Sequence, residues 1–255
     1  MGRDPYEELA QRFADHYTTL RGIVRHVLVD RQLREHLAPP PGRILDVGGG
    51  AGHQSIPLAR NGYAITILDS SGEMLRRAEH RLRAEDTDTR SRVELVEGRG
   101  EDAPSLFAEL DFGVALCHGV LMYLEDIDPL LDALGDVTAP GGVVSLLAKN
   151  AEALALRPAL QGRFQDAVEA FDADRDVGGL GVVTRADTIE DLTKRLSRVS
   201  IEVVAWYGVR VLTDHRVGEP PGPDAELVLQ AEWEASKRDP YRSIARLLHV
   251  VGRKR

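Results

Sequence analysis

The feature that most constrains the fold is a short apolar run that passes directly into a glycine-rich turn. Residues 43–47 carry the run, and residues 46–52 contain four glycines. Glycine adopts backbone angles that other residues avoid, and it lets a ligand come close to the main chain. A buried strand that ends in such a turn and continues into a helix is typical of α/β proteins.

The rest of the chain repeats this alternation of apolar runs and helical periodicity. Apolar segments of strand length are separated by segments in which apolar residues recur every three or four positions. Strands that alternate with helices imply right-handed crossovers. We therefore predict an α/β fold with a seven-stranded, mainly parallel sheet. The predicted strands are 43–47, 63–68, 93–96, 112–117, 142–148, 199–207 and 245–251, and the predicted helices among them are 54–61, 74–84, 127–137, 187–196 and 224–237.

Two further segments lie outside this alternation. Residues 5–37 show helical periodicity, which the prolines and glycine at 39–42 interrupt. The segment 151–195 is more irregular and contains a glycine cluster near residue 180. We predict four parts: N-terminal helices over 1–40 that cover a ligand site, a core over 41–150, a helical cap insertion over 151–195, and the C-terminal part of the sheet over 196–255.

The composition favours a globular protein of the cytoplasm. Of the 255 residues 43% are hydrophobic and 29% charged, and no apolar stretch reaches the length of a membrane span. The N-terminus has no secretory pattern, and the lone Cys117 fits a reducing compartment. The net charge of −9 disfavours general nucleic-acid binding. Residues 237–255 nevertheless hold seven basic residues against one acid, as a solvated tail or as an anion-binding face.

Acidic residues follow several predicted strands, where an α/β sheet binds its ligands. Asp69 comes twenty-one residues after Gly48, and a carboxylate there can accept both hydroxyls of a ribose. A dinucleotide site requires G-x-G-x-x-G, whereas Gly48, Gly50 and Gly52 give G-x-G-x-G after Asp46. This spacing resembles the first motif of the class I methyltransferases. Their cofactor, S-adenosylmethionine, lacks a pyrophosphate and carries cationic groups that favour carboxylates, and we predict it here.

A narrower resemblance covers nearly the whole chain, including its C-terminal third. The matching stretches are 25–28, 46–52, 117–121, 208–211 with Asp214, and parts of 239–250. In these the chain resembles the tRNA 5-carboxymethoxyuridine methyltransferases. The resemblance implies a Rossmann-like class I methyltransferase fold, S-adenosylmethionine as the cofactor and tRNA as the partner that carries the methyl acceptor.

The resemblance also implies a set of cofactor-binding residues, which we complete with Asp46 and Gly50 from the turn itself. The positions that match the family's cofactor site are Arg25, Gly48, Gly49, Asp69, Gly100, Glu101 and His118. The family has alanine at the position of Gly100 and glutamine at that of Glu101, so a side-chain contact there is less secure than a backbone contact. A helix over the pocket would aim Arg25 at the cofactor's carboxylate, and the alternative is surface charge.

The chemistry of the implied reaction sets what the acceptor site needs. A carboxylate is already ionised at neutral pH, so methylation of its oxygen needs a cation or N–H donor to position it and no general base. We predict Asn150, Arg210, Tyr241 and Arg242 as acceptor-binding residues and assign no catalytic residue. The alternative for Arg210 is an ion pair with Asp214, and for Tyr241 a packed ring.

His118 follows the fourth predicted strand, where cofactor and acceptor would meet. It is either a general base for a hydroxyl acceptor or a neutral wall of the pocket, and the resemblance favours the wall. No cluster of Cys and His residues shows metal-ligand spacing, so no metal is predicted.

Three functions are compatible with these features. The first is carboxyl O-methylation of 5-carboxymethoxyuridine at the wobble position of tRNA. The second is methylation of a small molecule, such as a secondary metabolite, on the same scaffold. The third is cofactor binding without catalysis. We predict no membrane partner, and the sequence does not define the oligomeric state.

Overall fold

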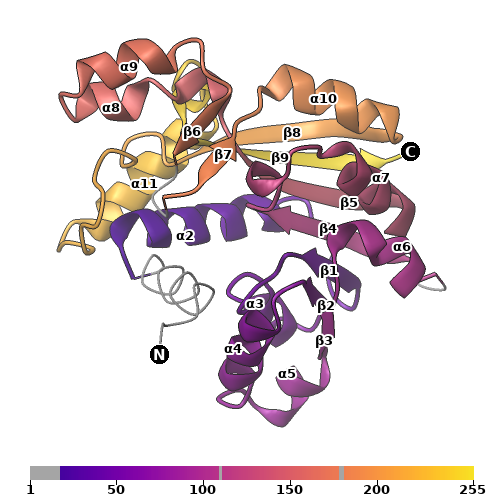
Figure 1. The fold of residues 1–255 in the computed structure, drawn as a ribbon. Helices are drawn as coiled ribbons and strands as arrows, with labels where there is room; N and C mark the ends of the chain where they lie inside the picture. Colours follow the sequence, from indigo (N-terminus) through magenta and orange to yellow (C-terminus); the bar gives the residue numbers. More distant parts are fainter. Residues whose placement is uncertain (1–17, 109–110, 178–180) are drawn as a thin grey trace, which may run out of the picture.

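A central sheet covered by helices on both faces forms the body of the molecule (Figure 1). The structure is a computed structural model that describes residues 18–108, 111–177 and 181–255. Within these residues, seven strands form one sheet in the order β3-β2-β1-β4-β5-β9-β8, in which only β9 is antiparallel to its neighbours. The predicted α/β fold with a mainly parallel sheet is confirmed. The strands are β1 Arg43–Val47, β2 Ala64–Asp69, β3 Val93–Glu97, β4 Phe112–His118, β5 Thr138–Lys149, β8 Ile201–Val209 and β9 Leu247–Lys254.

Apolar stripes of the helices bury the two faces of the sheet. One face packs against Leu131 of α7 and Leu196 of α10, and the other against Leu33 of α2, Leu58 of α3 and Leu75 of α4. The helices of these two layers are α2 Leu20–Arg34, α3 Ser55–Arg60, α4 Gly72–Leu82, α5 Thr87–Ser91, α6 Ala103–Leu106, α7 Asp128–Val137 and α10 Ile189–Arg198. Helix α11, Ala225–Ser236, lies against α2 and β8.

The described part of the N-terminal segment holds one helix, α2, inside the predicted helical region 5–37. Within the described residues α2 begins at Leu20, because the Thr19 side chain accepts a hydrogen bond from the Gly22 amide and acts as its N-cap. The helix ends at Arg34, three residues before the predicted end. Residues 1–17, which hold the start of the predicted helix, lie outside the described residues.

The segment between β5 and β8 carries two short helices and a hairpin. Helices α8 Leu156–Leu160 and α9 Phe164–Ala170 stand together apart from the sheet (Figure 1). Strands β6 Arg175–Val177 and β7 Val183–Arg185 pair in antiparallel fashion, and the predicted glycine cluster between them falls partly on residues 178–180, outside the described part. Among the described helices, none is both long enough and apolar enough to cross a membrane.

Candidate cofactor and acceptor site

The glycine turn after β1 takes a backbone path that few other residues could follow. Gly48, Gly50 and Gly52 have φ angles of 68°, 56° and 71°, in the left-handed region. A side chain at Gly48 would overlap a methyl group of Val120, which follows β4. The turn therefore lies directly against the segment after β4, at the carboxyl edge of the sheet.

Asp69 ends β2 next to this turn. Its carboxylate accepts hydrogen bonds from the amides of Gly50 at 2.8 Å and Ser71 at 2.9 Å. Burial raises its pKa, although these two amides favour the charged form. The carboxylate joins the glycine turn to the start of α4, which is the position required of a group that receives ribose hydroxyls.

Asp46 has a different environment from Asp69. It is buried, and its carboxylate accepts a hydrogen bond from the Ser55 hydroxyl at the start of α3. Burial raises its pKa to about 6. A Cβ on Gly49 would lie 2.7 Å from an Asp46 carboxylate oxygen, so the Asp46 side chain packs directly against the turn.

Gly100 and Glu101 form a short helical turn after β3, Gly100–Asp102. A side chain at Gly100 would meet Leu130 and Val47, so the backbone passes close to α7 and β1. The Glu101 carboxylate lies 3.3 Å from an Arg99 guanidinium nitrogen and is mostly buried. The backbone here is held by packing, while the Glu101 side chain is placed by an ion pair.

Arg25 and His118 meet at the end of β4. An Arg25 guanidinium nitrogen donates to the His118 carbonyl at 3.1 Å, so α2 reaches over the carboxyl edge of the sheet. His118 Nε2 lies 2.8 Å from the Ser145 hydroxyl, and burial lowers its pKa well below the usual value. A pKa so far below the usual value makes the imidazole a weak proton acceptor, which fits a pocket wall better than a general base. The structure thus brings the predicted cofactor residues to one edge, and their roles stay predictions.

Arg210, predicted to bind the acceptor, belongs to a buried group of arginines around Asp214. Nitrogens of Arg157, Arg210, Arg21 and Arg246 lie 2.5, 3.3, 3.9 and 3.9 Å from the Asp214 carboxylate. The arginines hold the pKa of Asp214 well below its usual range, against the opposing effect of burial. The ion pair that was the alternative for Arg210 is present.

Arg246 links this group to a second carboxylate, Asp176. Asp176 accepts from Arg246 and from Lys149, whose Nζ lies 3.3 Å away. We call the seven residues together the arginine cluster. Its members are Arg21, Lys149, Arg157, Asp176, Arg210, Asp214 and Arg246. Five cations face two carboxylates there, and most of these side chains are buried, so the cluster favours an added anion.

The cluster lies one helical turn from the predicted cofactor residues. Arg21 and Arg25 are four positions apart on α2, which corresponds to a rise of about 6 Å. The Asn150 amide, just after β5, donates to the Arg246 carbonyl. Sequence analysis missed Arg21, Arg157 and Arg246 because they come from segments far apart in the chain, and no local spacing marks them.

The structure gives the other acceptor candidates surroundings different from those of Arg210. Asn150 is buried, and its amide donates to the Ser243 and Ala245 carbonyls while its oxygen accepts from the Glu152 amide. Its polar atoms are committed to the fold, so it does not offer a donor to an acceptor.

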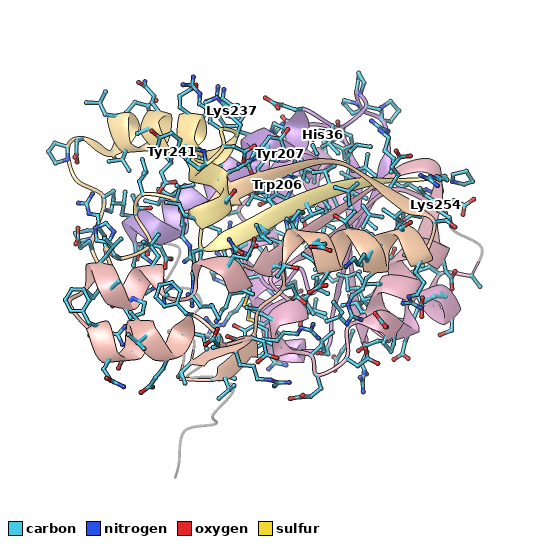
Figure 2. The ribbon with its side chains drawn as sticks, turned by 90° about the horizontal axis from the view of Figure 1, so that it is seen from above. His36, Trp206, Tyr207, Lys237, Tyr241 and Lys254 are labelled. Atoms are coloured by element: carbon cyan, nitrogen blue, oxygen red, sulfur yellow. The ribbon has the colours of Figure 1, made fainter. Side chains whose placement is uncertain are left out.

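Tyr241 and Arg242 lie in a short helical turn, Tyr241–Ile244, beside β8. Tyr241 is exposed, and Figure 2 labels it together with Trp206 of β8. Arg242 is stacked 3.9 Å above the Trp206 ring and paired with Asp239 at 2.7 Å. Both residues belong to the outer surface.

A cavity of about 440 Å³ opens beside the arginine cluster, between the cap helices and the hairpin. Arg157, Asp176 and Arg246 of the cluster line it, together with Arg163, Asp166, Glu169 and Arg175. Apolar residues such as Leu154 and Val183 complete its walls. This cavity has a size and a charge that suit a polar small molecule or an extruded nucleotide base.

Metal and thiol chemistry find no support among the described residues. No group of three His, Cys, Asp or Glu side chains is placed to hold a metal ion within 18–108, 111–177 and 181–255. Cys117 is buried and burial raises the pKa of its thiol, which keeps it protonated and unreactive.

Known proteins with a similar sequence or fold are methyltransferases. A methyltransferase domain model matches residues 45–144. The ubiquinone biosynthesis O-methyltransferase of Paracidovorax citrulli is 31% identical over 157 residues, which cover 59% of this chain and 63% of that protein. The crystal structure of the glycopeptide N-methyltransferase MtfA complexed with S-adenosylmethionine has a TM-score of 0.57 and 16% identity, covering 89% of this chain and 92% of the other.

The sheet order, the glycine turn and these matches define the class. The chain contains a methyltransferase domain over residues 45–144 and has the fold of the class I, S-adenosylmethionine-dependent methyltransferases. Over nearly its whole length it is similar to the tRNA 5-carboxymethoxyuridine methyltransferase of Escherichia coli strain K12. That protein is 28% identical over 255 residues, which cover 98% of this chain and 95% of the relative.

Proposed function

We propose that this methyltransferase acts in the cytoplasm on 5-carboxymethoxyuridine in tRNA and converts its carboxylate to a methyl ester. Similarity to the E. coli enzyme over 98% of the chain supports the substrate. The observation that carries the proposal is the arginine cluster, in which five cations face two carboxylates at the carboxyl edge of the sheet. Such an excess of buried positive charge is stabilised by an anionic substrate group.

We assign the cofactor to the glycine turn, Asp69, Arg25 and His118. Gly48 and Gly50 take left-handed angles in the turn, Asp69 offers a carboxylate to the ribose, and Arg25 offers a guanidinium to a carboxylate. S-adenosylmethionine supplies a methyl group on a sulfonium, which leaves as a neutral thioether when an acceptor oxygen attacks the methyl carbon.

The protein's contribution to this reaction is position and charge. Arg157 and Arg246 belong to the arginine cluster and also line the cavity. They can therefore hold the acceptor in the cavity with its carboxylate directed toward the cofactor. No proton has to be removed from a carboxylate at neutral pH, which agrees with a neutral His118. The segment 151–195 serves as a cap that excludes water from the acceptor.

Methylation of purified tRNA tests the proposal. Protein, S-adenosylmethionine and tRNA bearing 5-carboxymethoxyuridine are combined, and the nucleosides are analysed by mass spectrometry for the methyl ester. We expect Arg157→Gln to lower kcat/KM at least about tenfold, as expected for loss of a charged hydrogen bond, with cofactor affinity unchanged. The matched control Arg198→Gln changes an exposed arginine of α10 that pairs with Asp132 and does not line the cavity, and it should retain activity. An inactive wild-type protein, or a fully active Arg157→Gln variant, would refute the proposal.

A second candidate is methylation of a small carboxylic acid. The net charge of −9 opposes RNA binding, and the cavity is large enough for a metabolite. The ubiquinone biosynthesis O-methyltransferase that matches 59% of the chain acts, by its name, in the synthesis of a small molecule. Turnover of small carboxylates, together with no methylation of the modified tRNA, would favour this candidate.

A further inference from the structure

A chain of buried hydrogen bonds connects α2 to the end of β4 through the interior of the sheet. His118 Nε2 lies 2.8 Å from the Ser145 hydroxyl, which lies 2.8 Å from His249 Nε2. His249 Nδ1 lies 2.7 Å from the Gln32 amide oxygen, and the Gln32 amide nitrogen donates to the Gly208 carbonyl at 3.4 Å. Ser145, His249 and Gln32 are completely buried. We call this chain the relay.

The relay allows only one arrangement of protons. The Gln32 nitrogen donates to a carbonyl, so its oxygen is the acceptor and His249 Nδ1 carries a hydrogen. Burial lowers the pKa of His249 to about 3, so the ring is neutral and its Nε2 accepts from the Ser145 hydroxyl. The Ser145 oxygen then accepts from His118, whose hydrogen lies on Nε2.

This arrangement leaves His118 Nδ1 without a proton. Nδ1 is buried and has no hydrogen-bond partner among the described residues. Buried polar atoms are rarely left unpaired in native proteins, so an unpaired one at a ligand site points to a missing donor. Nδ1 is the ring nitrogen nearer the backbone, and the His118 carbonyl on that backbone receives the Arg25 guanidinium.

The position of the relay in the core indicates a function beyond stability. Ser145 lies between the buried residues Val144 and Leu146 on β5, where an apolar side chain would cost less to bury. Gln32 and Arg25 lie seven residues apart on α2, on the same face of the helix. Helix α2 is therefore connected to His118 in two ways, directly through Arg25 and indirectly through the relay that begins at Gln32.

We propose that Gln32, His249 and Ser145 are positioning residues that hold His118 as the Nε2–H tautomer, with Nδ1 as acceptor for the ammonium group of the cofactor. The amino acid end of S-adenosylmethionine carries its ammonium and carboxylate on one carbon. A carboxylate on Arg25 therefore brings the ammonium to the end of β4. The inference rests on the cofactor site proposed above and is independent of the methyl acceptor.

Nitrogen NMR of the full-length ¹⁵N-labelled protein tests the tautomer. At neutral pH, His118 should show a protonated Nε2 and an unprotonated Nδ1, and His249 the reverse, with the His249 signals identified by their loss in His249→Gln. S-adenosylhomocysteine should move the His118 Nδ1 resonance, whereas 5′-methylthioadenosine, which lacks the amino acid end, should not. Protonation of His118 at Nδ1, or equal shifts with both ligands, would overturn the inference. No binding of either ligand would overturn the cofactor site as well.

A pair of variants separates positioning from packing. Ser145→Ala removes the relay hydroxyl, and we expect it to weaken S-adenosylhomocysteine binding about tenfold, equivalent to about 1.4 kcal/mol, and to mix the His118 tautomers. Thr138→Val is the matched control, because Thr138 is equally buried and its hydroxyl donates only to the Leu134 carbonyl. Equal losses of affinity in both variants, or an unchanged tautomer in Ser145→Ala, would contradict the positioning role.

Discussion

Asp46 lies near the end of β1 and Asp69 ends the neighbouring strand β2, but their surroundings differ. Asp46 is enclosed and receives only the Ser55 hydroxyl from a side chain, while Asp69 is half-buried and receives two backbone amides. A carboxylate with two amide donors remains ionised and keeps lone pairs for a ligand. Asp46 therefore supports the turn, and Asp69 is the carboxylate that we propose for the ribose of the cofactor.

Replacing Asp69 should weaken cofactor binding strongly. Loss of two charge-assisted hydrogen bonds to a ribose predicts an affinity about 100-fold lower for Asp69→Ala, or about 3 kcal/mol. Isothermal titration with S-adenosylmethionine measures it. Asp132→Ala is the control, since Asp132 is exposed on α7 and pairs only with Arg198 at 3.2 Å. Unchanged affinity in Asp69→Ala would refute the ribose assignment.

Burial of Asp46 predicts a specific pH dependence of stability. Its folded pKa of about 6 lies above the usual aspartate value of 3.8, so the folded state favours the protonated form. Its contribution is complete below pH 3.8 and is lost as the pH rises through about 6. Asp46→Asn has no such loss. Relative to wild type, it should gain about 3 kcal/mol in free energy of unfolding between about pH 4 and pH 7.

Denaturant unfolding of both proteins across this pH range gives that difference, because the other titrating groups are common to both. If the difference in free energy of unfolding between the two proteins does not change with pH, Asp46 is ionised without cost in the folded state. Asp46→Asn can still accept from Ser55 through its amide oxygen, so the comparison isolates the charge.

At the level of elements, the strands were the most predictable part of the fold. Apolar runs such as β1 and β4 are buried on both faces in a parallel sheet, so composition alone marks them. Their ends were less predictable. β5 begins at Thr138 rather than 142, because Thr138 pairs with Phe112 ahead of a register shift in β4.

The β6–β7 hairpin, the relay and the arginine cluster were hidden from sequence analysis for a physical reason. The hairpin of β6 and β7 has only three residues in each strand, too few to show alternation. The relay and the arginine cluster depend on contacts between residues that are up to 217 positions apart, such as His249 and Gln32. Local patterns predicted the residues at the cofactor edge of the sheet. The relay and the arginine cluster are visible only in the tertiary structure.

The β1–α3 turn should tolerate no side chain at Gly48. Gly48→Ala combines a left-handed φ with overlap against Val120, which predicts a loss of about 3 kcal/mol in stability. Gly141 is a matched control, because its φ is 75° and a Cβ there meets no atom within 4 Å. Gly141→Ala should lose only about 1 kcal/mol. Denaturant unfolding compares the two, and equal losses would show that the Val120 contact relaxes freely.

At the scale of the whole molecule, strand direction explains why the C-terminal third matters for the site. β8 runs parallel to β5 and ends at the same edge, so Arg210 follows it there. β9 is antiparallel and begins at this edge, so Arg246 precedes it there. Because β9 is reversed, Arg210 and Arg246 both lie at the edge where β1, β2 and β4 present the predicted cofactor residues.

A tRNA substrate must approach a molecule with a net charge of −9, so its binding has to rely on local cations. Each phosphate contact releases counterions and makes affinity depend on salt. Raising salt from about 50 mM to about 200 mM should weaken binding of an anticodon stem-loop about tenfold, the effect of about two phosphate contacts.

Fluorescence anisotropy of a labelled stem-loop carrying 5-carboxymethoxyuridine measures this dependence, and S-adenosylhomocysteine binding under the same salts is the control, because that ligand has no phosphate. The cofactor affinity should stay nearly constant while the RNA affinity falls. If the RNA does not bind at low salt, or if its affinity does not change with salt, the arginine cluster serves a free carboxylate. The cluster is buried, and only an RNA backbone brings a row of phosphates to the surface.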